Sequence, residues 1–178
     1  KFVCNRYLKT FGIKVADAVL IRKQDVINSA EVIAQVGLPC FVKPNDGGSS
    51  FGITKVEVED QLKAAVELAL SHGSQAIVES FMRGREVTNG IYKGEKGTIP
   101  LPITEIVTDN GFFDFDAKYR GESNEITPAD LSLELTNKVK AVTKEIFDLL
   151  DLKGIARADY IIQGDEPYLI EINTVPGM

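Results

Sequence analysis

Four polar residues near the C-terminal end of the chain have types and spacings that could bind a divalent cation. The apolar run GIARADYII carries Arg157 and Asp159 two residues apart. A second run, PYLIEIN, carries Glu171 and Asn173 with the same spacing. Side chains alternate between the two faces of a strand, so the members of each pair are predicted to share one face.

The sequence QGDE between these runs predicts one antiparallel hairpin centred near Asp165. In that register Asp159 lies opposite Glu171, and Arg157 lies opposite Asn173. Two facing carboxylates repel each other unless a positive charge compensates. One such charge is magnesium, because two carboxylates and an amide oxygen leave coordination positions for phosphate oxygens. The other is Arg157, which could pair with both acids in a purely structural cluster, and the residues alone leave both interpretations open.

A second candidate site is the segment FVKPNDGGSSFGITKV, residues 41–56, where a lysine ends an apolar run and a loop of small polar residues follows. A P-loop would read G-x-x-x-x-G-K-[ST] and lead into a helix. Gly47 and Gly52 have that spacing, but Ile53 occupies the lysine position and the next residues alternate like a strand. The P-loop is therefore excluded. An ordinary glycine-rich hairpin and a hairpin whose amides and hydroxyls cover nucleotide phosphates both remain open.

The elements that must position these residues are mostly short strands. Helices are predicted over 2–11, 28–36 and 59–71, and a long helix is predicted to start at Thr127, Pro128 and Asp130 and to run to Leu149. The predicted strands are 16–21, 40–44, 53–56, 75–81, 85–92, 103–108, 111–115, 154–162 and 167–173, with an irregular loop over 116–127. Because strands outnumber helices and hairpins recur, the pattern favours an α+β fold with two lobes that meet near Arg83–Gly84.

Composition narrows the function classes. The chain has 178 residues, 44% hydrophobic and 26% charged, and its formal net charge of −6 argues against a general nucleic-acid binder. Cys4 and Cys40 have no metal-ligand spacing, and a count of only two cysteines favours a reduced, cytosolic chain over a disulfide scaffold. The one histidine, His72, is predicted to have a structural role. No apolar run in the sequence has the length of a membrane span. Since Lys1 is not an initiator methionine, we expect a piece of a longer protein.

The motifs together resemble the ATP-grasp domain of the D-alanine–D-alanine ligase family. FVKPNDGGSSFG resembles that family's lysine and serine loop, and IVESFMRGREVT resembles its adenine-side strand and hinge. FFDFDAKY resembles its mobile lid, and GIARADYII with YLIEINTVPGM resembles the end of its domain. The four motifs occur in the family's order and span nearly the whole chain. The resemblance implies an ATP-grasp fold of two α/β lobes, about 1–83 and 84–178, whose mainly antiparallel sheets enclose the nucleotide.

The resemblance also implies which residues bind ATP. Glu79 would accept a hydrogen bond from the adenine amino group, and Glu86 would hold the ribose hydroxyls. Lysines and the glycine–serine loop would contact the phosphates, while backbone groups after Glu79 would read the base edge. The implied ATP-binding set is Lys1, Lys43, Gly48, Ser49, Ser50, Glu79, Ser80, Met82, Glu86 and Lys118.

The catalytic and metal sets come from the same resemblance. Arg157 and the amide of Gly177 would stabilise the oxyanion of the tetrahedral intermediate. Ser49 and Tyr119 would form a hydrogen-bonded substrate clamp. The implied metal ligands, for two Mg²⁺ or Mn²⁺ ions, are Asp159, Glu171 and Asn173.

The implied activity is ATP-dependent joining of two D-alanines for peptidoglycan synthesis in the cytoplasm, with D-alanine and ATP as substrates and no nucleic-acid or membrane partner. The family carries a further domain before the position of Lys1 and a tail beyond Met178. This chain alone is therefore expected to bind MgATP and to make little dipeptide. The resemblance also allows a homodimer of the full-length protein.

Two other functions remain open from the sequence. One is a different ATP-grasp ligase, which would join D-alanine to D-lactate or D-serine or act on another carboxylate. Tyr119 favours the dipeptide, because the family's D-lactate enzymes lack a tyrosine at this position. The other is a non-catalytic ATP-binding module, which would not need the four hairpin residues that this chain retains.

Overall fold

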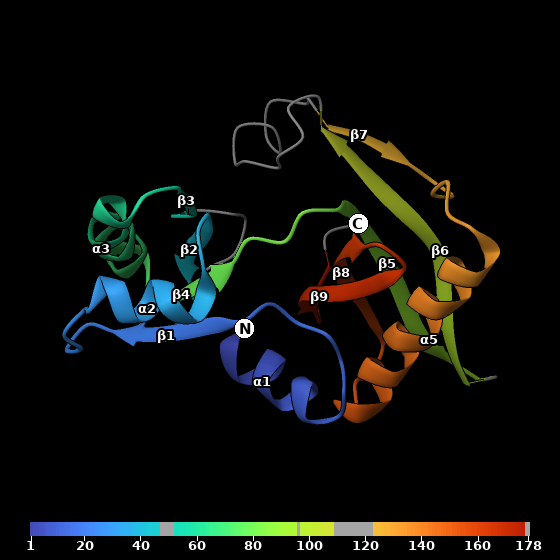
Figure 1. Ribbon diagram of the computed structural model, residues 1–178. Helices are drawn as coiled ribbons and strands as arrows, with labels where there is room; N and C mark the ends of the chain where they lie inside the picture. The colour runs from blue at the N-terminus through green and yellow to red at the C-terminus, as the bar shows by residue number, and fades with distance from the viewer. Residues whose placement is uncertain (47–51, 96, 109–122, 177–178) are drawn as a thin grey trace. The chain divides into compact units, whose positions relative to one another are not determined.

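The computed structural model describes residues 1–46, 52–95, 97–108 and 123–176 (Figure 1). Its helices are α1 Phe2–Thr10, α2 Ser29–Val36, the 3₁₀ helix η1 Glu59–Gln61, α3 Leu62–His72 and α5 Leu133–Leu149. Its strands are β1 Ala18–Arg22, β2 Cys40–Pro44, β3 Thr54–Val56, β4 Gln75–Ser80, β5 Arg85–Gly94, β6 Gly97–Thr108, β7 Ser123–Ile126, β8 Ile155–Gln163 and β9 Glu166–Asn173. The chain forms two compact units. Among the described residues, unit 1 holds 1–2, 16–46 and 52–82, and unit 2 holds 3–15, 83–95, 97–108 and 123–176.

Unit 1 is a four-stranded antiparallel sheet in the order β1-β4-β2-β3, packed against α2 and α3. The α2 helix begins after Asn28, whose Oδ1 accepts a hydrogen bond from Glu31 N, and it ends at Gly37 with φ 76°. The predicted apolar face of α3 is confirmed, because its four residues are all buried in the core of this unit. Those residues are Leu62, Ala65, Val66 and Ala69.

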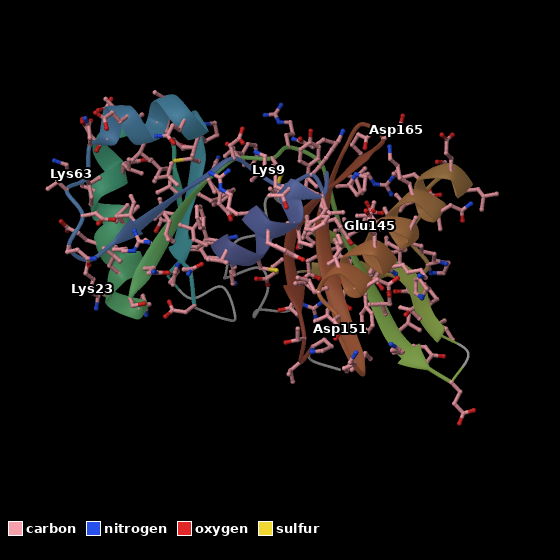
Figure 2. All side chains as sticks on the ribbon, turned by 90° about the horizontal axis from the view of Figure 1, so that it is seen from below. Lys9, Lys23, Lys63, Glu145, Asp151 and Asp165 are labelled. Atoms are coloured by element: carbon pink, nitrogen blue, oxygen red, sulfur yellow. The ribbon has the colours of Figure 1, made fainter. Side chains whose placement is uncertain are left out.

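Unit 2 is a five-stranded antiparallel sheet in the order β7-β6-β5-β8-β9, with α5 against one face (Figure 1). The core between helix and sheet includes Val139 and Ile146 of α5, Tyr160 of β8 and Leu169 of β9. The outer side of α5 is charged, and Figure 2 shows Glu145 there. Since strand side chains alternate, the other face of this sheet carries the alternate residues of β5 and β8, among them Glu86, Thr88, Arg157 and Asp159.

Helix α1 packs with unit 2, although the predicted boundary assigned residues 1–83 to the first lobe. Leu8 of α1 is completely buried, together with Ile13 and Val15, in the core that also holds α5. The reason is an edge contact. Val15 forms a parallel bridge with Leu169 of β9, so the segment after α1 extends the sheet of unit 2.

Two predictions for the region before the long helix were wrong. The helix does not start at Thr127, Pro128 and Asp130, because Thr127 Oγ1 is hydrogen-bonded to Thr104 Oγ1 at 2.6 Å and the next turn is tied to β6. Ser132 is the N-cap instead, and its Oγ accepts a hydrogen bond from Leu135 N at 3.2 Å. Part of the predicted loop 116–127 is strand β7, which pairs with the long strand β6.

The two cysteines follow the prediction made for them. Cys4 and Cys40 are free thiols, and burial raises the pKa of both. His72 lies in the last turn of α3, and its ring approaches Gly52, where an added Cβ would meet His72 Cδ2 at 2.8 Å. The backbone φ of +72° at position 52 favours glycine, because other residues rarely adopt this conformation.

None of the helices in the described residues combines the length and apolar character that crossing a membrane requires.

Candidate active site

The β8–β9 hairpin has the predicted residue pairs. Asp159 pairs with Glu171, and Arg157 pairs with Asn173. The turn is Gly164–Asp165, as Figure 2 shows for Asp165 at the hairpin tip, and Gln163 pairs with Glu166. An unbroken ladder from that turn would put Asp159 opposite Ile170. The predicted pairing of Asp159 with Glu171 is confirmed, but it depends on a feature that the prediction did not include.

A β-bulge at Ile170 is that feature. Tyr160 pairs with Leu169 and the next pair is Asp159 with Glu171, so Ile170 has no partner in β8. Leu169 is 1% exposed and faces the core, and strict alternation from it would point Glu171 into the core as well. One extra residue reverses the alternation. The bulge therefore turns Glu171 onto the same sheet face as Asp159.

Asp159 is the centre of the cluster on this face. Its Oδ1 accepts hydrogen bonds from Arg157 Nε at 2.8 Å and from Thr88 Oγ1 at 2.7 Å. Its Oδ2 accepts from Arg157 Nη2 at 3.1 Å and from Asn173 Nδ2 at 2.9 Å. The hydrogen bond to Asp159 raises the pKa of Arg157 against the opposing effect of burial, and the charges of Asp159, Glu171 and Glu125 raise it further. The guanidinium is thus a fixed, permanently charged group.

The oxygen donors of this face fit magnesium. Two carboxylates and one amide, those of Asp159, Glu171 and Asn173, are side chains that Mg²⁺ prefers. In the described part of the chain, no three His, Cys, Asp or Glu side chains group as a metal site. Two carboxylates and one amide would leave coordination positions of such an ion open for phosphate oxygens. Asp159 accepts four hydrogen bonds, which hold its carboxylate in a fixed orientation on this face.

Thr88 is a member of the cluster that the sequence analysis missed. It lies on β5 directly opposite Asp159, and it is two residues from Glu86, the predicted ribose ligand. Alternation puts Glu86 and Thr88 on one face. The run REVTNGIY contained this signal, because its apolar residues Val87 and Ile91 mark the buried face and leave Thr88 on the other.

In unit 1, Lys43 of β2 and Glu79 of β4 form an ion pair. Lys43 Nζ lies 2.6 Å from Glu79 Oε2, and the side chains are 8% and 12% exposed. Val42 and Val78, their neighbours in the two strands, belong to the core under α2 and α3. The pair therefore lies on the opposite face of the sheet. The structure brings together two residues that were predicted to contact different parts of ATP.

The remaining described residues of the ATP-binding set lie near this sheet. Ser80 N donates to Asp17 O at 2.9 Å, so the amide of Ser80 already has an acceptor in this structure. Met82 is two residues beyond the end of β4. Lys1 is held near the end of β2, because Phe2 N donates to Asn45 Oδ1 at 2.9 Å.

Several predicted site residues lie outside the described residues. They are Gly48, Ser49, Ser50, Lys118, Tyr119 and Gly177. The predicted strand 111–115 also falls there.

The two antiparallel sheets define an ATP-grasp domain, the fold of the solved structures to which this chain is similar. A family model described as the D-ala D-ala ligase C-terminus matches residues 7–178. The chain therefore belongs to the D-alanine–D-alanine ligase family.

Curated relatives cover the whole chain. It is 52% identical over 179 aligned residues to a D-alanine–D-alanine ligase of Parabacteroides distasonis, covering 100% of this chain and 54% of the relative. A D-alanine–D-alanine ligase of Bacteroides fragilis is 48% identical over the same length, with 55% of the relative covered. The chain thus spans about half the length of the curated relatives it matches.

Solved structures have the same fold. The D-alanine–D-alanine ligase of Bacillus anthracis complexed with ATP matches with a TM-score of 0.83 at 28% identity, covering 99% of this chain and 55% of that one. The VanG D-Ala:D-Ser ligase of Enterococcus faecalis matches with a TM-score of 0.81 at 31% identity, covering 98% and 51%. The fold is therefore common to ligases with different second substrates.

Proposed function

We propose that this chain is the ATP-binding part of an enzyme that joins two D-alanines into D-alanyl-D-alanine for peptidoglycan synthesis. The observation that carries the proposal is the β8–β9 hairpin, with a guanidinium, two carboxylates and an amide on one face. It occurs in a chain 52% identical to a curated D-alanine–D-alanine ligase. In the proposed reaction ATP phosphorylates the carboxylate of the first D-alanine. The amine of the second D-alanine attacks the acyl phosphate, and phosphate leaves.

In unit 2, Asp159, Glu171 and Asn173 would hold magnesium, which neutralises phosphoryl charge when it is bound. Arg157 has five N–H donors and directs Nε and Nη2 at Asp159. This contact holds the guanidinium plane in place, and the remaining donors stabilise the oxyanion of the tetrahedral intermediate. Glu86, on the same sheet face, would accept hydrogen bonds from the ribose hydroxyls.

In unit 1, the Lys43–Glu79 pair would serve the nucleotide without being broken. Lysine has three N–H donors, and Lys43 uses one of them on Glu79 Oε2, so the others can meet phosphate oxygens. Glu79 Oε1 can accept the adenine amino group. Each charge thereby orients the other in the absence of ATP. The roles predicted for the residues outside the described ranges stay predictions.

The relatives are nearly twice as long as this chain, so we assign the placement of the two D-alanines to parts beyond it. A displacement of about 1 Å can cost a hundredfold in rate. The 178-residue chain should therefore bind MgATP and make little dipeptide by itself. We also propose that the protein is cytoplasmic, because the proposed reaction consumes ATP.

A substrate screen tests this function. The full-length protein is assayed for phosphate release from ATP with D-alanine alone, and with D-alanine plus D-serine or D-lactate. We expect release and dipeptide formation with D-alanine alone. Preferential release with D-serine or D-lactate would make the chain part of the corresponding rival ligase. ATP binding with no release under any condition would support the non-catalytic module.

A further inference from the structure

The β-bulge at Ile170 is held by a residue from the other end of the chain. Asn5 of α1 donates a hydrogen bond from its Nδ2 to Ile170 O at 3.0 Å. Ile170 is the residue of β9 that has no partner in β8. Figure 1 shows α1 in dark blue and β9 in red, close to opposite ends of the colour scale. The contact joins residues 165 positions apart.

The bulge needs support because β9 is the edge strand of its sheet. Backbone groups on the outer side of an edge strand have no neighbouring strand to pair with, and a bulge interrupts the ladder on the inner side as well. The segment after α1 covers part of this edge, since Leu169 N donates to Lys14 O at 2.8 Å. The Asn5 amide supplies the next contact along the strand, at the bulged residue itself.

Loss of the bulge would move two of the proposed metal ligands. In an unbroken ladder Asp159 would pair with Ile170, and Glu171 would turn toward the core with Leu169. Asn173, two residues further, would turn with Glu171 and lose its contact with Asp159 Oδ2. The bulge therefore decides whether the cation ligands of β9 and β8 share a face.

We propose that Asn5 is a positioning residue for the magnesium site: by donating to the Ile170 carbonyl it stabilises the bulge that brings Glu171 and Asn173 beside Asp159. The inference rests on the proposed function of this hairpin. The amide nitrogen carries the role, because Asn5 Oδ1 is buried with no hydrogen-bond partner among the described residues. In this role Asn5 acts through the Ile170 carbonyl and not as a ligand of the cation.

The test is an Asn5→Leu variant, in which a side chain of similar size lacks the donor. Leucine also favours helix more than asparagine does, so α1 should not be destabilised. Asn5→Gln keeps an amide donor and is the rescue variant. Thr10→Ala is the matched control, because it removes a hydrogen bond from the same helix, Thr10 Oγ1 to Tyr7 O, without touching β9.

The measurements are Mn²⁺ affinity in the presence of a non-hydrolysable ATP analogue, followed by electron paramagnetic resonance, and amide hydrogen exchange in β9. In the full-length protein we expect Asn5→Leu to weaken Mn²⁺ binding at least tenfold, as substitutions behind metal ligands do. Exchange near Ile170 should accelerate, while affinity for the metal-free analogue and the melting temperature stay near wild type. Asn5→Gln should recover most of the affinity.

Three outcomes would overturn the inference. Wild-type Mn²⁺ affinity in Asn5→Leu would overturn it and leave the proposed function intact. An equal loss in Thr10→Ala would also overturn it, because the effect would then belong to α1 in general. A wild-type protein that binds no Mn²⁺ with the analogue would overturn the proposed function and this inference together.

Discussion

Lys43 and Glu79 form a nearly buried ion pair across two neighbouring strands, with Nζ 2.6 Å from Oε2. A buried pair adds little stability relative to apolar residues of similar size, whereas removal of one partner leaves an uncompensated charge. The proposed role of the pair in nucleotide binding and a purely structural role therefore predict different effects of substitution. Substitutions of these two residues, both in unit 1, distinguish a role in ligand binding from a role in stability.

Glu79→Gln should destabilise the protein and weaken ATP binding together. Loss of one partner from a buried pair costs about 3 kcal/mol. The double variant Lys43→Met with Glu79→Leu should recover most of that stability in urea unfolding. It should nevertheless fail to bind an ATP analogue in calorimetry. If the double variant binds the analogue as wild type does, the pair has no role in the nucleotide site.

In the full-length protein, Glu171→Gln should abolish magnesium-dependent turnover while the melting temperature stays within a few degrees of wild type. A metal-ligand carboxylate on a polar sheet face contributes little to packing. Asp159→Asn is the informative comparison, because it removes the negative charge and replaces one of the two oxygens that accept four hydrogen bonds with an NH₂ donor, and it should lower both stability and turnover. Calorimetric melting and a phosphate-release assay measure the two effects. Unfolding of Glu171→Gln would instead favour the structural ion-pair interpretation of the hairpin.

Arg157→Lys should lower turnover in the full-length protein far more than it lowers ATP affinity. Lysine keeps the positive charge, but it lacks the planar fork that meets both oxygens of Asp159. Loss of an oxyanion donor costs roughly two to three powers of ten in rate. Steady-state kinetics beside analogue binding separate the two quantities. Turnover equal to wild type would remove Arg157 from the catalytic set.

Thr88→Val should weaken divalent-cation binding about tenfold, as loss of a contact behind a metal ligand does. Valine has the shape of threonine and suits a strand, so the fold should be unaffected. What is lost is the hydroxyl donor to Asp159 Oδ1. Thr88→Ser keeps the hydroxyl and should bind the cation nearly as wild type does. Equal affinities for the Val and Ser variants would show that the hydroxyl has no role.

Several features of the fold and of the candidate site could be predicted from local patterns in the sequence. The apolar face of α3 has helical spacing, and its residues are buried as that spacing predicts. Alternation in β8 placed Arg157 and Asp159 on one face, and their hydrogen bonds confirm it. Such patterns are reliable because each depends only on the geometry of one helix or one strand. The ordered motifs likewise sufficed to identify the family.

What the sequence could not determine were contacts between distant segments. The predicted start of α5 failed because Thr127 is hydrogen-bonded to Thr104 of another strand, which leaves the cap to Ser132. The facing of Asp159 and Glu171 was predicted correctly, but it depends on the bulge at Ile170. A bulge becomes stable only when its freed backbone groups find partners, and here the partner is Asn5, 165 residues away. Tertiary packing alone decides such a pairing, because no local pattern specifies which distant side chain will meet an unpaired carbonyl.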